Sequence, residues 1–547
     1  MRTAFDTHEV LNQAPPFVDV NLFAADRPLR DAVNANGAHT EFAALERFGE
    51  GWGTAHMFEQ ARLANENPPK LRTFDPNGRR LDIVEFHPAY HRFMGESIGD
   101  GLAAMTWDEH GARAGAPNEV ARAARYYMVA QVENGHMCPV TMTRAAVAAL
   151  AAAPALLESV VPKINSRLYA PEFRTWTEKS GVTIGMGMTE KQGGSDVRAN
   201  ATRAEPAGDG YLVTGHKWFM SAPMSDAFLV LAQAPAGLTC FFMPRFTPDG
   251  HVNALRLQRL KDKLGNRSNA SSEVEFAGAF AWRVGEEGRG VRTIIEMVQL
   301  TRLDCAIASA GLMRMALAQA VHHARHRLVF KQKLADQPLM RTVLADLALE
   351  CEGAVAAMMR LCRSYDLAAG DPLEAARARL LTPVIKYWIC KGAPALIYEA
   401  MECLGGNGYV EEGVLARLYR EAPVNAIWEG SGNVVCLDVL RALSQEGEAA
   451  RMVLTHLVKE AGDLPGCAGA VKFIEHALSA TEEAHARAGV ERLALLAVVA
   501  ALRTSVAEVA PIFARCRLAA PFTRLFGAAE LAPAETTLLL ERGLSLH

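Results

Sequence analysis

Residues 185–197 read G-M-G-M-T-E-K-Q-G-G-S-D-V, and the fold prediction for the rest of the chain starts from this stretch. It follows an apolar, strand-like run, and two adjacent glycines lie between Thr189 and Ser195. Because glycine permits close approach, such a loop can turn backbone N–H groups and hydroxyls toward an anionic or polar ligand. The alternative is an ordinary polar hairpin loop. The stretch does not fit the nucleotide motifs G-x-G-x-x-G or G-x-x-x-x-G-K-[ST].

The residues that follow this loop predict a small β domain. Short runs at 210–219, 227–232, 238–243 and 272–276 are rich in β-branched and aromatic residues, and Gly, Pro, Asn or Asp separate them. That pattern is typical of antiparallel strands joined by turns. We therefore expect an antiparallel β-barrel over residues 181–286.

Helical periodicity dominates on both sides of this β domain. Asp371, Pro372 and Glu374 supply an N-cap, a proline and an acid for a first turn, so a helix is predicted from there to Leu404, before two glycines. A rod this long needs neighbours that cover its apolar stripe, which indicates a bundle. The predicted fold class is α+β. Its five zones are an arm (1–40), an N-terminal α-helical domain (41–180), the β-barrel (181–286), a C-terminal four-helix bundle (287–445) and an extra C-terminal helical domain (446–547).

Proline and glycine mark breaks near the N-terminus. Pro15, Pro16 and Pro28 should stop any long helix in the arm. N-P-P at 67–69 and D-P-N-G at 75–78 predict turns within a loop.

Composition narrows the class of protein. The chain has 547 residues, of which 50% are hydrophobic and 22% charged, as in a globular protein with a large core. A net charge of −4 argues against coating nucleic acid through overall charge, although a local basic patch stays open. Ten cysteines without a C-x-x-C pair or a Cys/His cluster favour reduced thiols in a cytoplasmic protein and no metal site. No secretory signal and no apolar run of ~20 residues are visible, so no membrane span is expected.

Two further stretches carry candidate chemistry. K-W-F-M-S at 217–221 places Trp218 where it can stack on a flat aromatic ligand, although a strand tryptophan is more often a core residue. A-I-W-E-G-S-G-N at 426–433 places Glu429 beside Trp428. A carboxylate against an aromatic wall has its pKa raised toward the range useful for a general base. On this stretch alone, a helix-capping acid is an equal alternative.

Together and in this order, these motifs resemble those of the acyl-CoA dehydrogenase family. The matches are M-T-E-x-x-x-G-S-D at Thr189, K-W-[FY]-[IM]-[ST] at Trp218, R-x-x-F at Arg327 and Phe330, L-G-G-x-G-Y at 404–409 and Glu-Gly-[ST] at 429–431. The resemblance covers about residues 45–443. It implies an FAD-dependent oxidoreductase whose flavin lies between the β domain and the C-terminal bundle.

The resemblance also implies a set of FAD contacts. Thr189 would bind the edge of the flavin ring and Ser195 the pyrophosphate, while Trp218 would pack on the isoalloxazine with Ser221 nearby. Further cofactor contacts at matching positions are Met186, Met188, Gly194, Trp428, Ser431 and Asn433. Across a subunit contact, the neighbour's FAD would be reached by Arg327, Phe330, Gln337, Gly405 and Gly406. A homo-oligomer, usually a tetramer, follows from that arrangement.

Glu429 takes the family's catalytic-base position. By resemblance it would remove the α-proton of an acyl-CoA while the β-hydride passes to flavin N5, and its backbone N–H would polarise the thioester carbonyl. Thr301 fills the slot where some relatives place their base and cannot serve as one, and a nitroalkane-oxidase-like reaction would prefer Asp at the base. Trp428 stands where Tyr is usual and narrows the pocket. We therefore expect a short branched substrate such as isovaleryl-CoA, with slow turnover.

A narrower resemblance, nearly end to end, is to the branch of the family that belongs to the bacterial adaptive response to DNA alkylation. It rests on Pro68 and Pro69, on 185–197, 260–271, 423–433 and 436–441, and on the arm and the extra C-terminal domain. It implies binding and protection of double-stranded DNA through basic C-terminal residues, for which the candidates are Arg441, Arg515, Arg517 and Arg524. From residue 441 on, the chain has 11 Lys and Arg against 12 Asp and Glu, a weak electrostatic footprint for DNA. The alternative is a metabolic short- or branched-chain acyl-CoA dehydrogenase with no DNA role.

Overall fold

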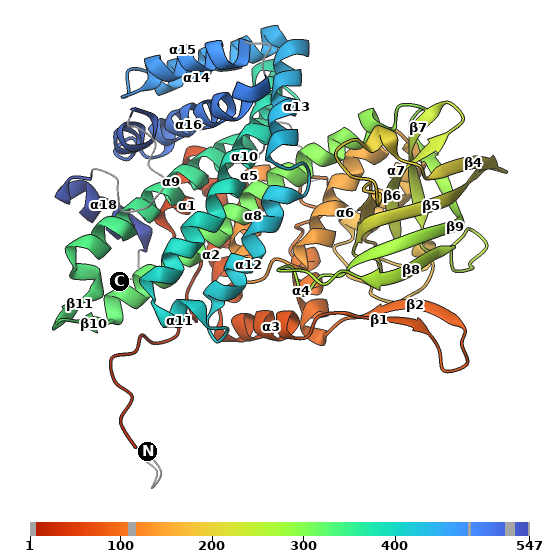
Figure 1. Ribbon diagram of the computed structural model, residues 1–547, viewed down its shortest axis with the longest axis horizontal. Coiled ribbons are helices and arrows are strands. Elements are labelled where there is room, and N and C mark those ends of the chain that lie inside the picture. The colour runs from red at the N-terminus through yellow and green to blue at the C-terminus, as the bar shows by residue number, and fades with distance from the viewer. Residues whose placement is uncertain (1–6, 108–115, 117, 480–482, 520–530, 545–547) are drawn as a thin grey trace.

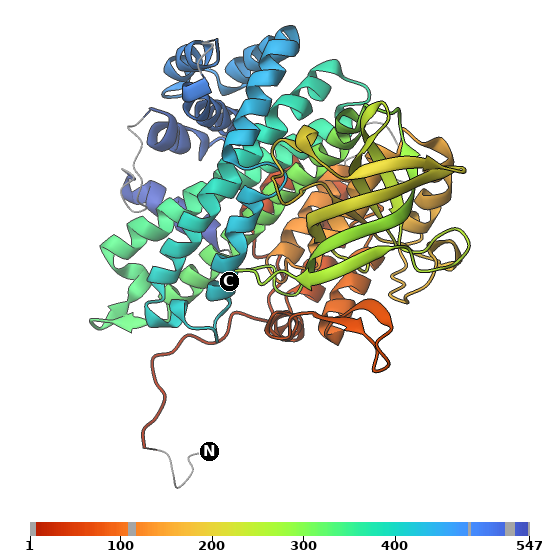
Figure 2. The same cartoon turned by 45° about the vertical axis from the view of Figure 1, so that its right-hand side comes forward.

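The computed structural model describes residues 7–107, 116, 118–479, 483–519 and 531–544 (Figure 1). Long helices form most of the molecule, and the β domain lies at one end of it (Figures 1 and 2). The β domain packs against the helical body through α6 and α8. Among the described helices, none combines the length and hydropathy that crossing a membrane requires.

The N-terminal part is helical but contains one β-hairpin. Its elements are α1 (Arg27–Ala35), α2 (Phe42–Trp52), α3 (Ala55–Glu66), β1 (Lys70–Phe74), β2 (Arg80–Glu85), α4 (Pro88–Gly99), α5 (Asn118–Ala130), α6 (Met137–Leu150) and α7 (Pro154–Asn165). β1 and β2 pair antiparallel around residues 75–78, so the segment expected to be a loop is a hairpin. The Asp75 carboxylate closes its turn by accepting hydrogen bonds from the N–H groups of Asn77 and Arg79. Pro28 does not stop a helix but lies in the first turn of α1, which Asp26 caps.

The β domain is a seven-stranded sheet that closes on itself. Its strands are β3 (Ile184–Gly187), β4 (Arg203–Ala207), β5 (Gly210–Ser221), β6 (Ala227–Ala234), β7 (Gly237–Pro244), β8 (Leu255–Leu260) and β9 (Ser271–Val284). The order is β3-β6-β4-β5-β9-β7, β7 also pairs with β6, and β8 pairs with β9. The four strands expected from the sequence are present as β5, β6, β7 and β9. The expectation of a purely antiparallel sheet is wrong, because β3 and β4 run parallel to β6. Parallel neighbours need a long connection instead of a hairpin, so turn signals do not reveal them.

The C-terminal bundle is built around α8. Its helices are α8 (Gly290–His326), α9 (Pro338–Leu367), α10 (Pro372–Cys403), α11 (Gly406–Tyr409), α12 (Val414–Ile427) and α13 (Gly432–Gln445), with a short hairpin of β10 (Leu328–Val329) and β11 (Gln332–Lys333). α8 contacts α5, α6, α9, α10 and α12, and it is buried around most of its circumference. The predicted start of α10 is confirmed, since the Asp371 carboxylate accepts from the N–H of Leu373 at 2.9 Å.

The last part of the chain is helical and packs on the bundle. It consists of α14 (Gly447–Ala461), α15 (Cys467–Ser479), α16 (Ala486–Ser505), α17 (Ala510–Phe513) and α18 (Pro533–Gly543). α16 contacts α9, α10 and α13, and α18 contacts α9. α14 is capped at its C-terminal end by Gly462, which has φ +62°. The domain boundaries drawn from the sequence remain predictions.

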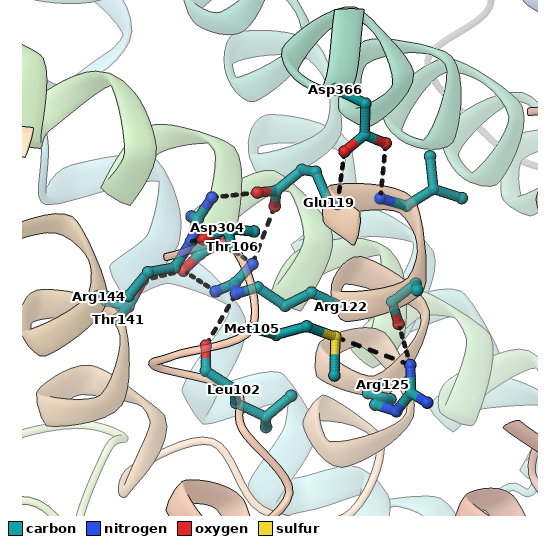
Figure 3. Close-up of polar contacts among 12 residues, drawn as sticks. Leu102, Met105, Thr106, Glu119, Arg122, Arg125, Thr141, Arg144, Asp304 and Asp366 are labelled. Atoms are coloured by element: carbon teal, nitrogen blue, oxygen red, sulfur yellow. Dashed lines mark hydrogen bonds and ion pairs between the residues drawn. The ribbon is translucent and has the colours of Figure 1, made fainter. Parts of the chain in front are cut away.

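A buried ion network joins the N-terminal helices to α8 (Figure 3). Arg122 on α5 pairs with Asp304 on α8 at 2.6 Å and with Glu119 at 3.1 Å. Arg144 on α6 also pairs with both Glu119 and Asp304. Asp366 on α9 accepts from the first N–H groups of α5, and burial raises the pKa of this carboxyl to about 7. The network therefore fixes α5, α6 and α9 relative to α8.

We predict that Asp304→Ala lowers the free energy of unfolding by about 3–5 kcal/mol, because it leaves two buried guanidinium groups without their shared acid. Urea denaturation at fixed protein concentration measures this change. Glu59→Ala is the matched control, since it removes an acid from the exposed pair with Arg62 and should change stability little. Equal stability of the two variants would contradict a structural role for the network.

Candidate functional site

The candidate base lies in a short loop between α12 and α13, residues 428–431, which we call the base loop. Glu429 has φ +58° and Gly430 has φ +100°. A left-handed backbone costs a non-glycine residue roughly 1–2 kcal/mol, so surrounding contacts must hold Glu429 in this conformation.

Two buried cations supply those contacts. The Lys386 ammonium on α10 donates to the carbonyl oxygens of Trp428 at 2.9 Å and Gly430 at 2.7 Å. The Arg302 Nε on α8 donates to the carbonyl of Glu429 at 2.8 Å. Arg302 is itself held by an ion pair of 2.6 Å with Asp438 on α13. Three consecutive carbonyl groups are thus bound from two helices.

The Glu429 carboxylate is hydrogen-bonded to α8. Thr301 Oγ1 donates to Glu429 Oε2 at 2.8 Å, so Thr301, which cannot be the base itself, supports it. Burial raises the pKa of Glu429, and the Thr301 hydroxyl, Arg302 and Lys386 act in the opposite direction. A carboxyl with a raised pKa is suited to take a proton near neutral pH.

Trp428 is fixed beside the candidate base. Its Nε1 donates to Asn425 Oδ1 at 3.1 Å, and Asn425 in turn donates to Ser309 on α8 at 3.0 Å. The indole therefore cannot swing away without breaking this part-buried hydrogen bond. The restriction of the space next to Glu429 by Trp428 stays a prediction.

The loop after β3 is held by a second buried ion pair. Lys217 on β5 contacts Glu190 at 2.7 Å, and Glu190 also accepts from the N–H of Ala201 at 2.7 Å. The N–H of Trp218 donates to the carbonyl of Thr189 at 2.8 Å, which fixes the loop against β5. Part of the surface stays exposed at five residues of this region, which together we call the β-domain wall: Met186, Met188, Thr189, Trp218 and Ser221.

The backbone geometry explains the two glycines of this loop in different ways. Gly193 has φ +144°, and a Cβ added there would meet no described atom within 4 Å. A Cβ at Gly194 would lie 2.5 Å from Thr189 Oγ1, too close for any side chain. Ser195 follows on the exposed face. The loop therefore combines an open backbone with nearby hydroxyls.

Cys138 on α6 is a buried thiol whose pKa responds to both the β domain and the candidate base. Burial raises the pKa of this thiol to about 12, so it is a neutral lining group. Ser221 of β5 lowers that pKa and the charge of Glu429 raises it. Groups from the β domain and from the loop of Glu429 thus both influence this thiol, and their joint contact with a flavin stays a prediction.

The residues of the β-domain wall and around the base loop fit a flavin dinucleotide. Trp218 offers a half-exposed indole to a planar ring, and the Lys261 ammonium lies 3.3 Å from the centre of that indole. Thr189 and Ser195 offer hydroxyls beside the open glycine backbone. Ser431 and Asn433 lie at the exposed start of α13, where N–H groups favour an anion.

The residues assigned to a neighbour's FAD lie far from Glu429 in the same copy. Figure 1 shows the β10–β11 hairpin and α11 together at the end of the bundle opposite the β domain. Phe330 has 89% of its surface exposed, and a Cβ at Gly405 or Gly406 would meet no described atom within 4 Å. Arg327 donates to the carbonyl of Asn12 in the arm, and Gln337 donates to Val329 at 3.2 Å. One copy alone therefore does not bring these residues to its own base.

The candidate DNA contacts differ in exposure. The Arg441 side chain is 61% exposed beside Asp438. Arg515 pairs with Glu535. Arg517 is only 13% exposed and pairs with both Asp346 and Glu350 on α9. Arg524 lies outside the described residues.

Arg302 and Lys386 were not among the residues singled out in the sequence. A signal existed for Lys386, because it is a lone cation between the apolar neighbours Ile385 and Tyr387 on a helix expected to be enclosed. Such a lysine is buried only when polar groups surround its ammonium. The sequence does not show that those groups are the carbonyls of the base loop.

Three family models match consecutive parts of the chain. They are the adaptive response protein AidB N-terminal domain over residues 12–171, the acyl-CoA dehydrogenase middle domain over 185–279 and the acyl-CoA dehydrogenase C-terminal domain over 288–444. A protein of Escherichia coli (strain K12) named as acyl-CoA dehydrogenase AidB is 52% identical over 444 residues, which are 81% of each chain. The chain belongs to the acyl-CoA dehydrogenase family. Like the members of that family, it is an FAD-dependent oxidoreductase.

Two solved structures extend the match to the C-terminal part. The structure titled Bd2924 apo-form is 28% identical with a TM-score of 0.82, and the match covers 90% of this chain and 99% of that one. Caenorhabditis elegans ACDH-11 in complex with C11-CoA is 25% identical with a TM-score of 0.83, covering 100% and 94%. The predicted AidB resemblance and the predicted fold are confirmed.

Proposed function

We propose that this protein dehydrogenates short branched acyl-CoA thioesters, with Glu429 as the base. The observation that carries the proposal is the position of its carboxyl group. Glu429 has a raised pKa, accepts from Thr301, and influences the same Cys138 thiol as Ser221. This is the arrangement that proton abstraction beside a flavin requires.

Each wall has a separate task in this proposal. The β-domain wall with Thr189, Trp218 and Ser221 would hold the FAD ring, and Ser195 its pyrophosphate. FAD supplies an acceptor for the hydride that leaves the substrate β-carbon. Glu429 takes the proton from the α-carbon, and its backbone N–H donates to the thioester carbonyl, where negative charge develops.

Trp428 sets the proposed substrate class. Because Asn425 fixes the indole, Trp428 would restrict the space beside the base. A short branched acyl group such as isovaleryl fits this restriction better than a long chain. Slow turnover follows if the physiological substrate differs from isovaleryl-CoA.

The oligomer would complete the cofactor site. Exposed apolar side chains gather on the β10–β11 hairpin, α11 and the start of α9, namely Leu328, Phe330, Leu339, Tyr409 and Val410. A contiguous apolar patch on a folded surface marks a contact with another protein. A second copy placed there would cover this patch and bring Arg327 and Gln337 to its FAD, within a homotetramer.

A role in protecting double-stranded DNA is the second candidate. It is favoured by the identity to AidB and by the match to an adaptive response protein domain. The exposed Arg441 is the described candidate contact with the most accessible charge. The internal pairing of Arg517 and the near-neutral C-terminal region weigh against a strong contact.

We predict that Glu429→Gln retains bound FAD but slows anaerobic bleaching of the flavin absorbance by isovaleryl-CoA by at least about 10²-fold, the usual effect of losing a general base. Glutamine keeps the size of the side chain and can still accept from Thr301. Glu448→Gln, an exposed acid on α14, is the control and should behave as the wild type. Unchanged bleaching in Glu429→Gln would exclude this residue as the base.

We predict that Phe330→Asp lowers the molar mass measured by light scattering and reduces the FAD content, because a charge in the apolar patch disfavours the second copy. Phe473→Asp on α15 makes the same chemical change at another exposed phenylalanine and should change neither quantity. A Phe330→Asp protein with wild-type mass and FAD content would place the subunit contact elsewhere.

We predict that the protein binds duplex DNA with an affinity that falls by ~0.9 log unit per neutralised phosphate for each log unit of salt. Arg441→Ala should reduce that slope by about 1, whereas Arg198→Ala on the β domain should not. Negligible binding at low salt would remove the DNA role and leave the metabolic dehydrogenase.

A further inference from the structure

The backbone of the base loop is strained at Glu429. Glu429 adopts φ +58° between α12 and α13, a conformation that glycine would adopt with less strain. Since a glycine cannot carry the carboxylate, the strain must be offset by contacts to the loop backbone. Lys386 makes two of them, to the residues on either side of Glu429.

These two contacts also set the direction of the peptide groups. In a trans peptide the N–H points opposite to the carbonyl. Because the carbonyl of Trp428 points at Lys386, the N–H of Glu429 points away from α10. In the same way, the carbonyl of Gly430 is turned toward α10.

We propose that Lys386 is a positioning residue for the base: its ammonium group holds the loop of Trp428, Glu429 and Gly430 in the conformation in which the carboxylate and the N–H of Glu429 both serve the substrate. This inference rests on the proposed function, because it assigns how that base is held. Lys386 does not touch the substrate and acts through Glu429.

A lysine is suited to this place. It has three donors on a tip small enough to lie between two carbonyls, and only 1% of its surface is exposed. Its charge also lies at the end of α12, where the last carbonyls of a helix favour a cation. Burying an ammonium group is costly, so the two carbonyl contacts are needed for the folded state as well.

Other groups face the carboxyl of Glu429 and must be considered with Lys386. α8 contributes the Thr301 hydroxyl, the Arg302 guanidinium and the Cys305 thiol, and α6 contributes the Cys138 thiol. Both thiols are neutral, since burial raises their pKa. The charged groups that favour the ionised carboxylate are therefore Arg302 and Lys386.

The direction in which Lys386 shifts the pH dependence of the rate follows from the charge state that the base needs. The base must be ionised to take a proton, so the rate rises as pH passes through the pKa of Glu429. Lys386 lowers the pKa of Glu429 against the effect of burial. Removing its charge raises that pKa and moves the rising limb of the rate profile to higher pH.

The experiment compares Lys386→Met, Lys386→Gln and Lys386→Arg as FAD-bound protein. We expect Lys386→Met to lower kcat for isovaleryl-CoA by about 10²-fold, as for a displaced catalytic group, with a smaller change in KM. Its pH profile should move to higher pH. Lys386→Gln, which keeps a donor but no charge, should recover part of the rate and none of the shift, and Lys386→Arg should recover part of both.

A second readout does not need turnover. Infrared difference spectroscopy follows the protonated carboxyl band that is absent in Glu429→Gln, and its titration should move to higher pH in Lys386→Met. The control is Lys179→Met, which removes another buried lysine, paired with Asp226 at 2.6 Å in the β domain, and should leave the titration unchanged.

The outcomes separate the two proposals. If the wild type is not reduced by any acyl-CoA but the carboxyl titration moves in Lys386→Met, the proposed reaction fails and the positioning role stands. If the wild type is reduced and Lys386→Met keeps both its pH profile and its carboxyl titration, the positioning role is overturned. The positioning role is also overturned if Lys386→Met and Lys179→Met lose the same amount of rate and neither changes the titration of the Glu429 carboxyl. Lys386 would then contribute only to the stability of the fold.

Discussion

The carbonyl oxygens of Trp428, Glu429 and Gly430 accept hydrogen bonds from two buried cations, and the position of the candidate base depends on this contact. A left-handed residue in this loop is strained, so contacts from neighbouring helices must hold its backbone. Arg302 and Lys386 come from α8 and α10, which run side by side through the bundle (Figure 1). The bundle, and not the loop sequence, therefore determines where the carboxylate lies. The same cations keep the carboxylate available for ionisation although burial disfavours its charge.

α8 transmits this constraint to the N-terminal helices. Arg302 and Asp304 are two residues apart, so they project about 200° apart around the helix axis. Arg302 faces the base loop, while Asp304 faces Arg122 and Arg144 of α5 and α6 (Figure 3). Any rotation or sliding of α8 would break one set of buried ion pairs or the other.

Local signals in the sequence predicted the elements that local interactions determine. Runs rich in β-branched and aromatic residues predicted β5 and β9, and the cap at Asp371 predicted the start of α10, because neighbours in sequence decide both. The strand-like run that became β3 was recognised, but its parallel pairing with β6 was not, since β6 lies across a connection of about forty residues. At the site, Glu429 and Thr189 were recognisable from motifs, whereas Lys386 was not. Its role arises from a contact between residues more than forty positions apart, and a single sequence contains no signal for such a pair.

Ion pairs join the C-terminal helices to α9 of the bundle. Arg517 pairs with Asp346 and Glu350 on α9, and Arg542 pairs with Glu352, two residues further along the same helix. These guanidinium groups neutralise a row of acids on α9, so they are not available to a polyanion. On α16, Arg487 lies beside Gly432 at the start of α13, directly after the base loop. A buried or semi-buried cation that pairs within the fold contributes to packing and not to an external field. The paired cations Arg517 and Arg542 therefore support α9, and a nucleic-acid contact of this region would use cations that remain at the surface, such as Arg441.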